Sequence, residues 1–84
     1  MLTLDKFEEA SKIVSEVTLE TKLIYSDFLS EKCGNSIYLK PENMQLTGAY
    51  KVRGAYYKIS TLTAEERKKG LITASAGNHA QGVA

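Results

Sequence analysis

One lysine, Lys51, occupies a position that suits chemistry with a carbonyl compound. It follows a Thr47-Gly48 pair and begins a stretch whose apolar residues have the i, i+3, i+4, i+7 spacing of an amphipathic helix. Those apolar residues are Val52, Ala55, Tyr56, Ile59 and Leu62. Lys51 is therefore expected in the first helical turn, where the helix dipole disfavours an ammonium group. The neutral amine is the form that attacks a carbonyl to give a Schiff base. From position alone, a catalytic lysine and a solvated lysine both stay open as interpretations.

A second candidate segment runs from residue 71 to residue 82. Its first part, Leu71-Ile72-Thr73-Ala74, predicts a short buried strand. The next part, Ser75-Ala76-Gly77-Asn78-His79-Ala80-Gln81-Gly82, predicts a turn of small residues and a helix start. This order of elements presents backbone N–H groups to an anion. From the residues alone, Asn78 could instead be a helix N-cap and His79 an ordinary helix residue.

Taken together, these segments resemble the threonine ammonia-lyase (threonine/serine dehydratase) family of fold-type II pyridoxal-phosphate (PLP) enzymes. The residues that carry the resemblance are Lys40-Pro41-Glu42-Asn43, Thr47-Gly48-Ala49-Tyr50-Lys51-Val52-Arg53-Gly54-Ala55 and Ser75 to Gly82. The flanking segments extend the resemblance over nearly the whole chain. It implies an α/β, tryptophan synthase beta-like architecture with a parallel sheet. Residues 1–84 would form its N-terminal portion, without an internal domain boundary. Because the sequence stops inside an expected helix, we expect a truncated part of a longer enzyme.

The resemblance implies PLP-dependent β-elimination of L-threonine, and of L-serine as a further substrate, to a 2-oxo acid and ammonia. Lys51 matches the lysine that carries PLP and takes the α-proton. The ring of Tyr50 would flank the cofactor, and Asn78 would hydrogen-bond its ring oxygen. PLP supplies the electron sink, while the protein supplies orientation and proton transfer. The resemblance also implies a homo-oligomer when the chain is full-length, acting in isoleucine biosynthesis or threonine catabolism.

The resemblance further assigns a substrate loop that holds the amino acid's carboxylate. Its residues here are Ser75, Ala76, Gly77, Asn78 and His79. Racemising relatives have a serine at the position of Ala76, as an acid/base on the far face of the cofactor. With alanine there, elimination is expected over racemisation. Two alternatives stay open, namely a serine racemase-like relative and an inactive fragment that serves only as a small structural or binding domain.

Composition and charge argue against several other classes of protein. The 84 residues carry 11 basic and 10 acidic side chains, a formal charge of +1, so nothing indicates nucleic-acid binding. No apolar run approaches the ~20 residues of a membrane span, and the N-terminus lacks a signal-peptide pattern. The single cysteine, Cys33, fits a reducing cytoplasm. The single histidine, His79, has no partners that would indicate a metal site.

Further helices and strands are expected to hold the two candidate segments in place. Apolar spacing predicts a first helix from Leu4 to about Val17, with Thr3 or Asp5 as its N-cap. The other expected elements are a helix capped by Ser26 and ended by Gly34, strands at Leu23–Tyr25 and Ser36–Lys40, and a helix with a capping box at Thr63–Glu66. Alternating strands and helices favour the α/β class with a parallel sheet.

The loop before Lys51 is expected to need support of its own. Arg53 lies two residues after Lys51 and therefore points to a different side of the helix. It could hold the loop through a carboxylate such as Glu42, and a solvated surface arginine is the alternative.

The 84 residues could make one small domain that buries roughly 60% of the unfolded chain's surface.

Overall fold

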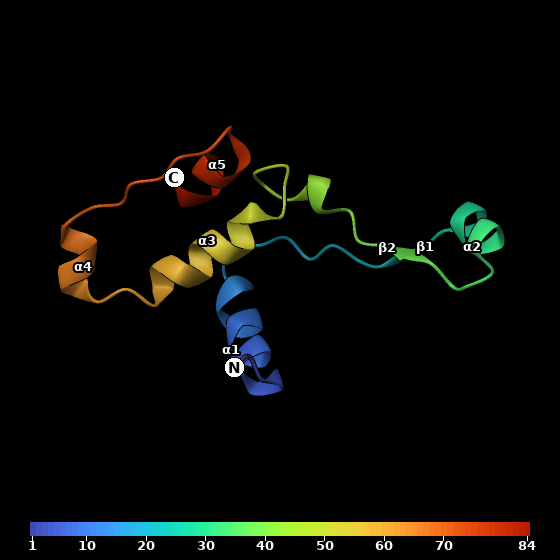
Figure 1. Cartoon of the computed structure of the whole chain (residues 1–84), viewed down its shortest axis with the longest axis horizontal. Helices are drawn as coiled ribbons and strands as arrows, with labels where there is room; N and C mark the ends of the chain where they lie inside the picture. The colour runs from blue at the N-terminus through green and yellow to red at the C-terminus, as the bar shows by residue number, and fades with distance from the viewer.

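Helix α3 (Lys51–Ser60) is the element against which two other helices of the chain pack. The structure is a computed structural model that describes residues 1–84. The remaining elements are α1 (Leu4–Val14), β1 (Ile24–Tyr25), α2 (Asp27–Cys33), β2 (Tyr38–Leu39), the 3-10 helix η1 (Glu42–Met44), α4 (Ala64–Lys68) and α5 (Asn78–Val83). In Figure 1, α1 and α5 lie beside α3, while the small sheet with α2 and helix α4 lie at opposite ends of the molecule.

The chain is elongated and encloses little apolar core. It measures 52 × 31 × 22 Å with a radius of gyration of 16.1 Å, against about 12 Å for a compact domain of this length. Val14 and Ala55 are the buried hydrophobic residues, while Phe7 is 59% exposed and Ile72 fully exposed. The 84 residues could make one small domain, but in this structure they do not enclose a core of their own. Most apolar helix faces have no second layer of structure opposite them.

The single sheet pairs β1 with β2 in antiparallel register. Ile24 lies opposite Leu39 and Tyr25 opposite Tyr38, and the two tyrosine rings meet edge to face at 5.4 Å. Both strands fall where the sequence predicted extended chain, although each is only two residues long. No parallel sheet is formed. The predicted strand Leu71–Ala74 is extended but unpaired and exposed, because no second strand lies beside it to complete a ladder.

Most predicted helix ends are confirmed. Helix α2 begins after Ser26, whose hydroxyl accepts a hydrogen bond from the Leu29 N–H, and helix α4 begins with the full capping box of Thr63 and Glu66. Helix α1 starts after Thr3, as expected, but without a side-chain cap. It also ends at Val14, three residues earlier than predicted, because the chain passes into turns there.

Candidate active site

Lys51 is the first residue of α3, as the helical spacing predicted. The preceding residue, Tyr50, occupies the N-cap position, and its side chain makes no capping hydrogen bond. The Lys51 Nζ lies 5.1 Å from the centre of the Tyr50 ring, within the range of a cation–π contact. Both side chains are exposed, so the lysine amine is accessible at the start of the helix.

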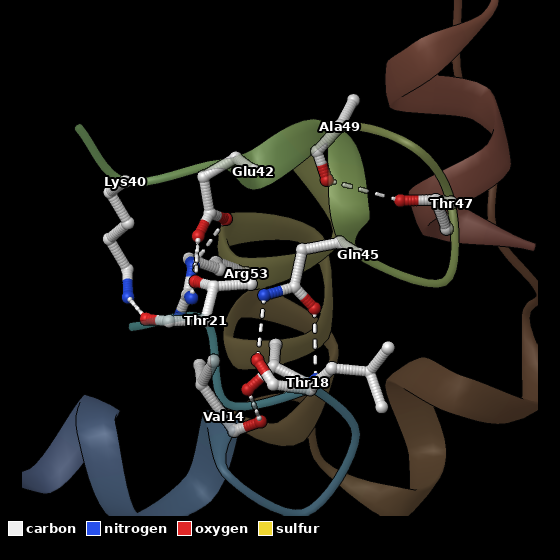
Figure 2. A network of polar contacts seen from close by, with 10 residues as sticks. Val14, Thr18, Thr21, Lys40, Glu42, Gln45, Thr47, Ala49 and Arg53 are labelled. Atoms are coloured by element: carbon white, nitrogen blue, oxygen red, sulfur yellow. Dashed lines mark hydrogen bonds and ion pairs between the residues drawn. The ribbon is translucent and has the colours of Figure 1, made fainter. Parts of the chain in front are cut away.

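An ion pair between Arg53 and Glu42 connects α3 to the segment that precedes it (Figure 2). Arg53 Nε donates to Glu42 Oε2 at 2.8 Å, and Nη2 donates to Oε1 at 2.9 Å. The Thr21 hydroxyl donates a third bond to Glu42 Oε1 at 3.1 Å. The Arg53 hydrogen bonds, supported by the Thr21 bond, lower the pKa of the Glu42 carboxyl from its ordinary 4.5 to about 2. The predicted contact between Arg53 and Glu42, which would hold the loop before Lys51, is therefore present.

Gln45 adds a second connection that the sequence did not reveal. Its side-chain Nε2 donates to the Leu19 carbonyl and its Oε1 accepts from the Leu19 N–H, both at 2.9 Å. Gln45 is 5% exposed, and its backbone carbonyl accepts the Gly48 N–H at 2.8 Å. Gln45 thus ties the loop before Lys51 to the segment that follows α1. No local pattern indicates this contact, because the two residues are 26 positions apart.

The start of α5 is capped by Ser75. The Ser75 hydroxyl accepts hydrogen bonds from the Gly77 N–H at 3.0 Å and from the Ala80 N–H at 3.2 Å. Gly77 occupies the N-cap position with φ 154°, a backbone conformation that side-chain-bearing residues rarely adopt. Asn78 is the first helical residue. The N-cap interpretation of Asn78 is therefore wrong, because Gly77 is the N-cap and Ser75 accepts from two of the free N–H groups of this helix end.

The two candidate segments meet at one cleft. Its volume is about 510 Å³, and its lining residues are Lys51, Ala74, Ser75, Ala76, Gly77, Asn78 and His79. Every predicted substrate-loop residue thus lies around the same opening as the predicted Schiff-base lysine. Tyr50 does not line this cleft but borders a neighbouring one of about 340 Å³, which it shares with Lys51 and His79.

The groups around the cleft fit an aldehyde-bearing cofactor with polar ring substituents. Lys51 supplies a primary amine, the group that condenses with an aldehyde. Asn78 supplies an amide that can donate to or accept from a ring oxygen. The turn at Ser75–Gly77 supplies main-chain N–H groups and the exposed start of a helix, which favour a carboxylate. No cluster of three or more His, Cys, Asp or Glu side chains able to hold a metal ion occurs in the structure.

Comparison with known proteins agrees with this set of groups. Residues 14–84 match the family described as pyridoxal-phosphate dependent enzyme, and the chain belongs to that family. Over all 84 residues it is 56% identical to an L-threonine ammonia-lyase from Thermotoga maritima. It is 48% identical over 84 residues to a biosynthetic L-threonine dehydratase from Lactococcus lactis, and 45% identical over 82 residues to a catabolic L-threonine dehydratase from Escherichia coli.

The fold also matches a solved structure. A processed threonine deaminase isoform 2 from Solanum lycopersicum superposes with a TM-score of 0.74 over 98% of this chain, at 42% identity. The chain spans only 20–25% of the length of these relatives, so it corresponds to a part of each. No helix of the structure has both the length and the apolar character needed to cross a membrane.

Proposed function

We propose that this chain is the lysine-bearing part of an enzyme that converts L-threonine, and also L-serine, into a 2-oxo acid and ammonia. One observation carries the proposal. The first residue of α3, Lys51, and the Ser75–His79 turn line one cleft, in a chain 56% identical to an L-threonine ammonia-lyase. The family supplies the cofactor class, since its members depend on pyridoxal phosphate. When bound, PLP supplies an electron sink that stabilises negative charge on the substrate's α-carbon.

Lys51 holds the cofactor through Nζ and, once freed by the incoming amino acid, takes the α-proton. An amine can do both because it is a nucleophile when neutral and a base toward a nearby acidic C–H. Lys51 is the first residue of α3, and this position matters because a side chain on a helix is held more closely than one on a loop. The Glu42–Arg53 pair and Gln45 support this placement by tying the preceding loop to the rest of the chain.

The Ser75–His79 turn orients the substrate's carboxylate. Both acceptor positions of the Ser75 hydroxyl are already used by the N–H groups of Gly77 and Ala80. A hydroxyl has one O–H donor besides its two acceptor lone pairs, so the Ser75 proton stays available for an anion. Asn78 begins the helix beside this turn and provides an amide toward the cofactor. The turn thus combines a preorganised donor with the favourable end of a helix.

The same proposal extends to the sheet, the location and the assembly of the whole enzyme. Leu71–Ala74 is extended, apolar and unpaired, which suits a strand that joins a parallel sheet completed by further parts of a fold-type II enzyme. Residues 1–84 would then be one N-terminal portion of the catalytic region. We place the enzyme in the cytoplasm as a homo-oligomer, in threonine catabolism or isoleucine biosynthesis. The single exposed cysteine supports the cytoplasm, and the names of the relatives, one biosynthetic and one catabolic, support the two pathways. The homo-oligomer rests on the family resemblance alone.

The deciding experiment locates the cofactor on the full-length enzyme. Borohydride reduction followed by peptide mapping should find the phosphopyridoxyl group on Lys51, and Lys51→Ala should abolish both cofactor absorbance and 2-oxo acid formation. Lys58→Ala is the matched control, because Lys58 is an exposed lysine of the same helix. That variant should keep the spectrum and the activity of the unmodified enzyme. Finding the label on Lys40 or Lys58 would overturn the assignment.

A further inference from the structure

We infer that Gly82 is a positioning residue that sets how closely the Asn78 end of α5 approaches Lys51. This inference rests on the proposed function and deepens it. Helix α5 packs against α3, and Gly82 makes the tightest backbone approach among the six glycines. A Cβ placed on Gly82 would lie 3.1 Å from the Val52 nitrogen and 3.2 Å from both the carbonyl carbon and oxygen of Lys51. The contact is thus with the peptide bond that follows the predicted catalytic lysine.

The same face of α5 carries Asn78. Residues four apart on a helix lie one above the other, so Asn78 and Gly82 project from one side of α5. Because the Gly82 side touches the start of α3, the Asn78 side chain originates on the face turned toward that helix. The distance between the backbones at Gly82 therefore controls how far the Asn78 amide and the preceding turn lie from the Lys51 amine.

A methyl group at this position cannot be accommodated by moving a side chain. The atoms that it would meet belong to the backbone of the first turn of α3, which is fixed by helical hydrogen bonds and by the Arg53–Glu42 pair. The two helices must then separate by a few tenths of an ångström. Functional groups need to be held within roughly 0.5 Å of their productive geometry, so a shift of this size uses up most of that tolerance.

Gly54 provides the matched control. It lies inside α3, as Gly82 lies inside α5, and a Cβ built on it meets no atom within 4 Å. Neither glycine has a positive φ, so alanine is compatible with the backbone at both positions. Alanine also favours a helix over glycine at either site. The two substitutions therefore differ in the contact with Lys51 and Val52 and not in their intrinsic effect on a helix.

The test compares Gly82→Ala with Gly54→Ala in the full-length enzyme. Gly82→Ala should shift the absorbance maximum of the bound cofactor, weaken PLP binding measured by titration of the apoenzyme, and lower kcat by about three- to tenfold. Gly54→Ala should leave all three within about twofold of the unmodified enzyme. Equal behaviour of the two variants would overturn the inference while leaving the proposed function intact. The proposed function fails separately, if the unmodified enzyme does not carry PLP on Lys51.

A second measurement covers the case in which Gly82→Ala does not fold. An experimental structure of the unmodified full-length enzyme, with and without PLP, should keep Gly82 in van der Waals contact with the Lys51–Val52 peptide. Retention of this contact in both states supports the positioning role. Separation of the two segments by a side chain or by water in the PLP-bound state would overturn it.

Discussion

Arg53 binds the carboxylate of Glu42 with two hydrogen bonds, from Nε to Oε2 at 2.8 Å and from Nη2 to Oε1 at 2.9 Å. Glu42 lies in η1 and Arg53 in α3, eleven residues apart, so the pair closes the loop that leads into Lys51. The side chains are 34% and 19% exposed for Arg53 and Glu42. A bidentate pair that is partly shielded from water fixes geometry better than a fully exposed one.

The first prediction concerns the pH dependence of this pair. The folded-state pKa of Glu42, about 2, lies below its ordinary value of 4.5. A depressed carboxyl pKa contributes stability that is present above the unfolded-state value and is lost as the pH falls through the folded-state value. The stability gap between the unmodified enzyme and Glu42→Gln should therefore be constant above about pH 5 and shrink from about pH 4.5 toward pH 2. Urea unfolding of both proteins across this pH range measures the difference in their unfolding free energies. A difference at about pH 3 equal to that above about pH 5 would contradict the prediction.

The second prediction concerns Gln45. Gln45→Ala removes both hydrogen bonds to the Leu19 backbone and leaves that N–H and carbonyl without their protein partners. The loss should cost about 1–3 kcal/mol of unfolding free energy, measured from urea midpoints. The exposed Gln81 of α5 is the control, and Gln81→Ala should stay within about 0.5 kcal/mol of the unmodified protein. Equal midpoints for the two variants would show that the contact with Leu19 adds no stability.

The sequence predicted the helix starts well because the signals are local. Ser26 and Thr63 lie within four residues of the N–H groups that they cap, and the apolar spacing from Val52 onward locates the start of α3. The resemblance named every residue that lines the cleft apart from Ala74, since these residues fall in two short motifs.

The contacts that hold those motifs together were not predictable, because they join residues distant in sequence. Gln45 reaches Leu19 across 26 positions, and the tight approach of Gly82 to Lys51 spans 31 positions by their numbers. The N-cap of α5 is Gly77, whereas the residues alone left Asn78 open as a cap, because a glycine has no side chain that signals this role. The buried strand at Leu71–Ala74 was predicted from its apolar run, yet a strand also needs a partner, and no pattern within those four residues supplies one.

The third prediction separates the roles of Ser75 and Asn78. Ser75→Ala removes the acceptor for the Gly77 and Ala80 N–H groups and should lower stability by about 1 kcal/mol. Asn78→Ala removes no cap, so its stability should change little. Its expected effect is on the cofactor, as a lower kcat and a shifted PLP absorbance in the full-length enzyme. An unchanged spectrum with lowered stability would assign Asn78 a structural role only.

The fourth prediction tests which reaction the site favours, and it concerns Ala76. The Ala76 position lines the cleft with Lys51 and carries no hydroxyl, and the one free O–H of the neighbouring Ser75 is assigned to the substrate's carboxylate. Reprotonation of the α-carbon from the face opposite Lys51 needs a donor within about 3 Å, and a methyl group cannot donate a proton. The full-length enzyme should therefore convert L-serine or L-threonine into 2-oxo acid without appreciable release of D-amino acid.

Chiral chromatography of an L-serine reaction, run beside a 2-oxo acid assay, measures both products at once. Ala76→Ser restores a hydroxyl at this position and is the informative variant, while Ala74→Ser adds a hydroxyl elsewhere on the rim of the same cleft. If the face opposite Lys51 lacks only a donor, D-serine should rise in the Ala76→Ser enzyme and not in the Ala74→Ser enzyme. D-serine formed by the unmodified enzyme as fast as pyruvate would replace the ammonia-lyase proposal with a racemase, because a far-face donor would then have to exist at another residue.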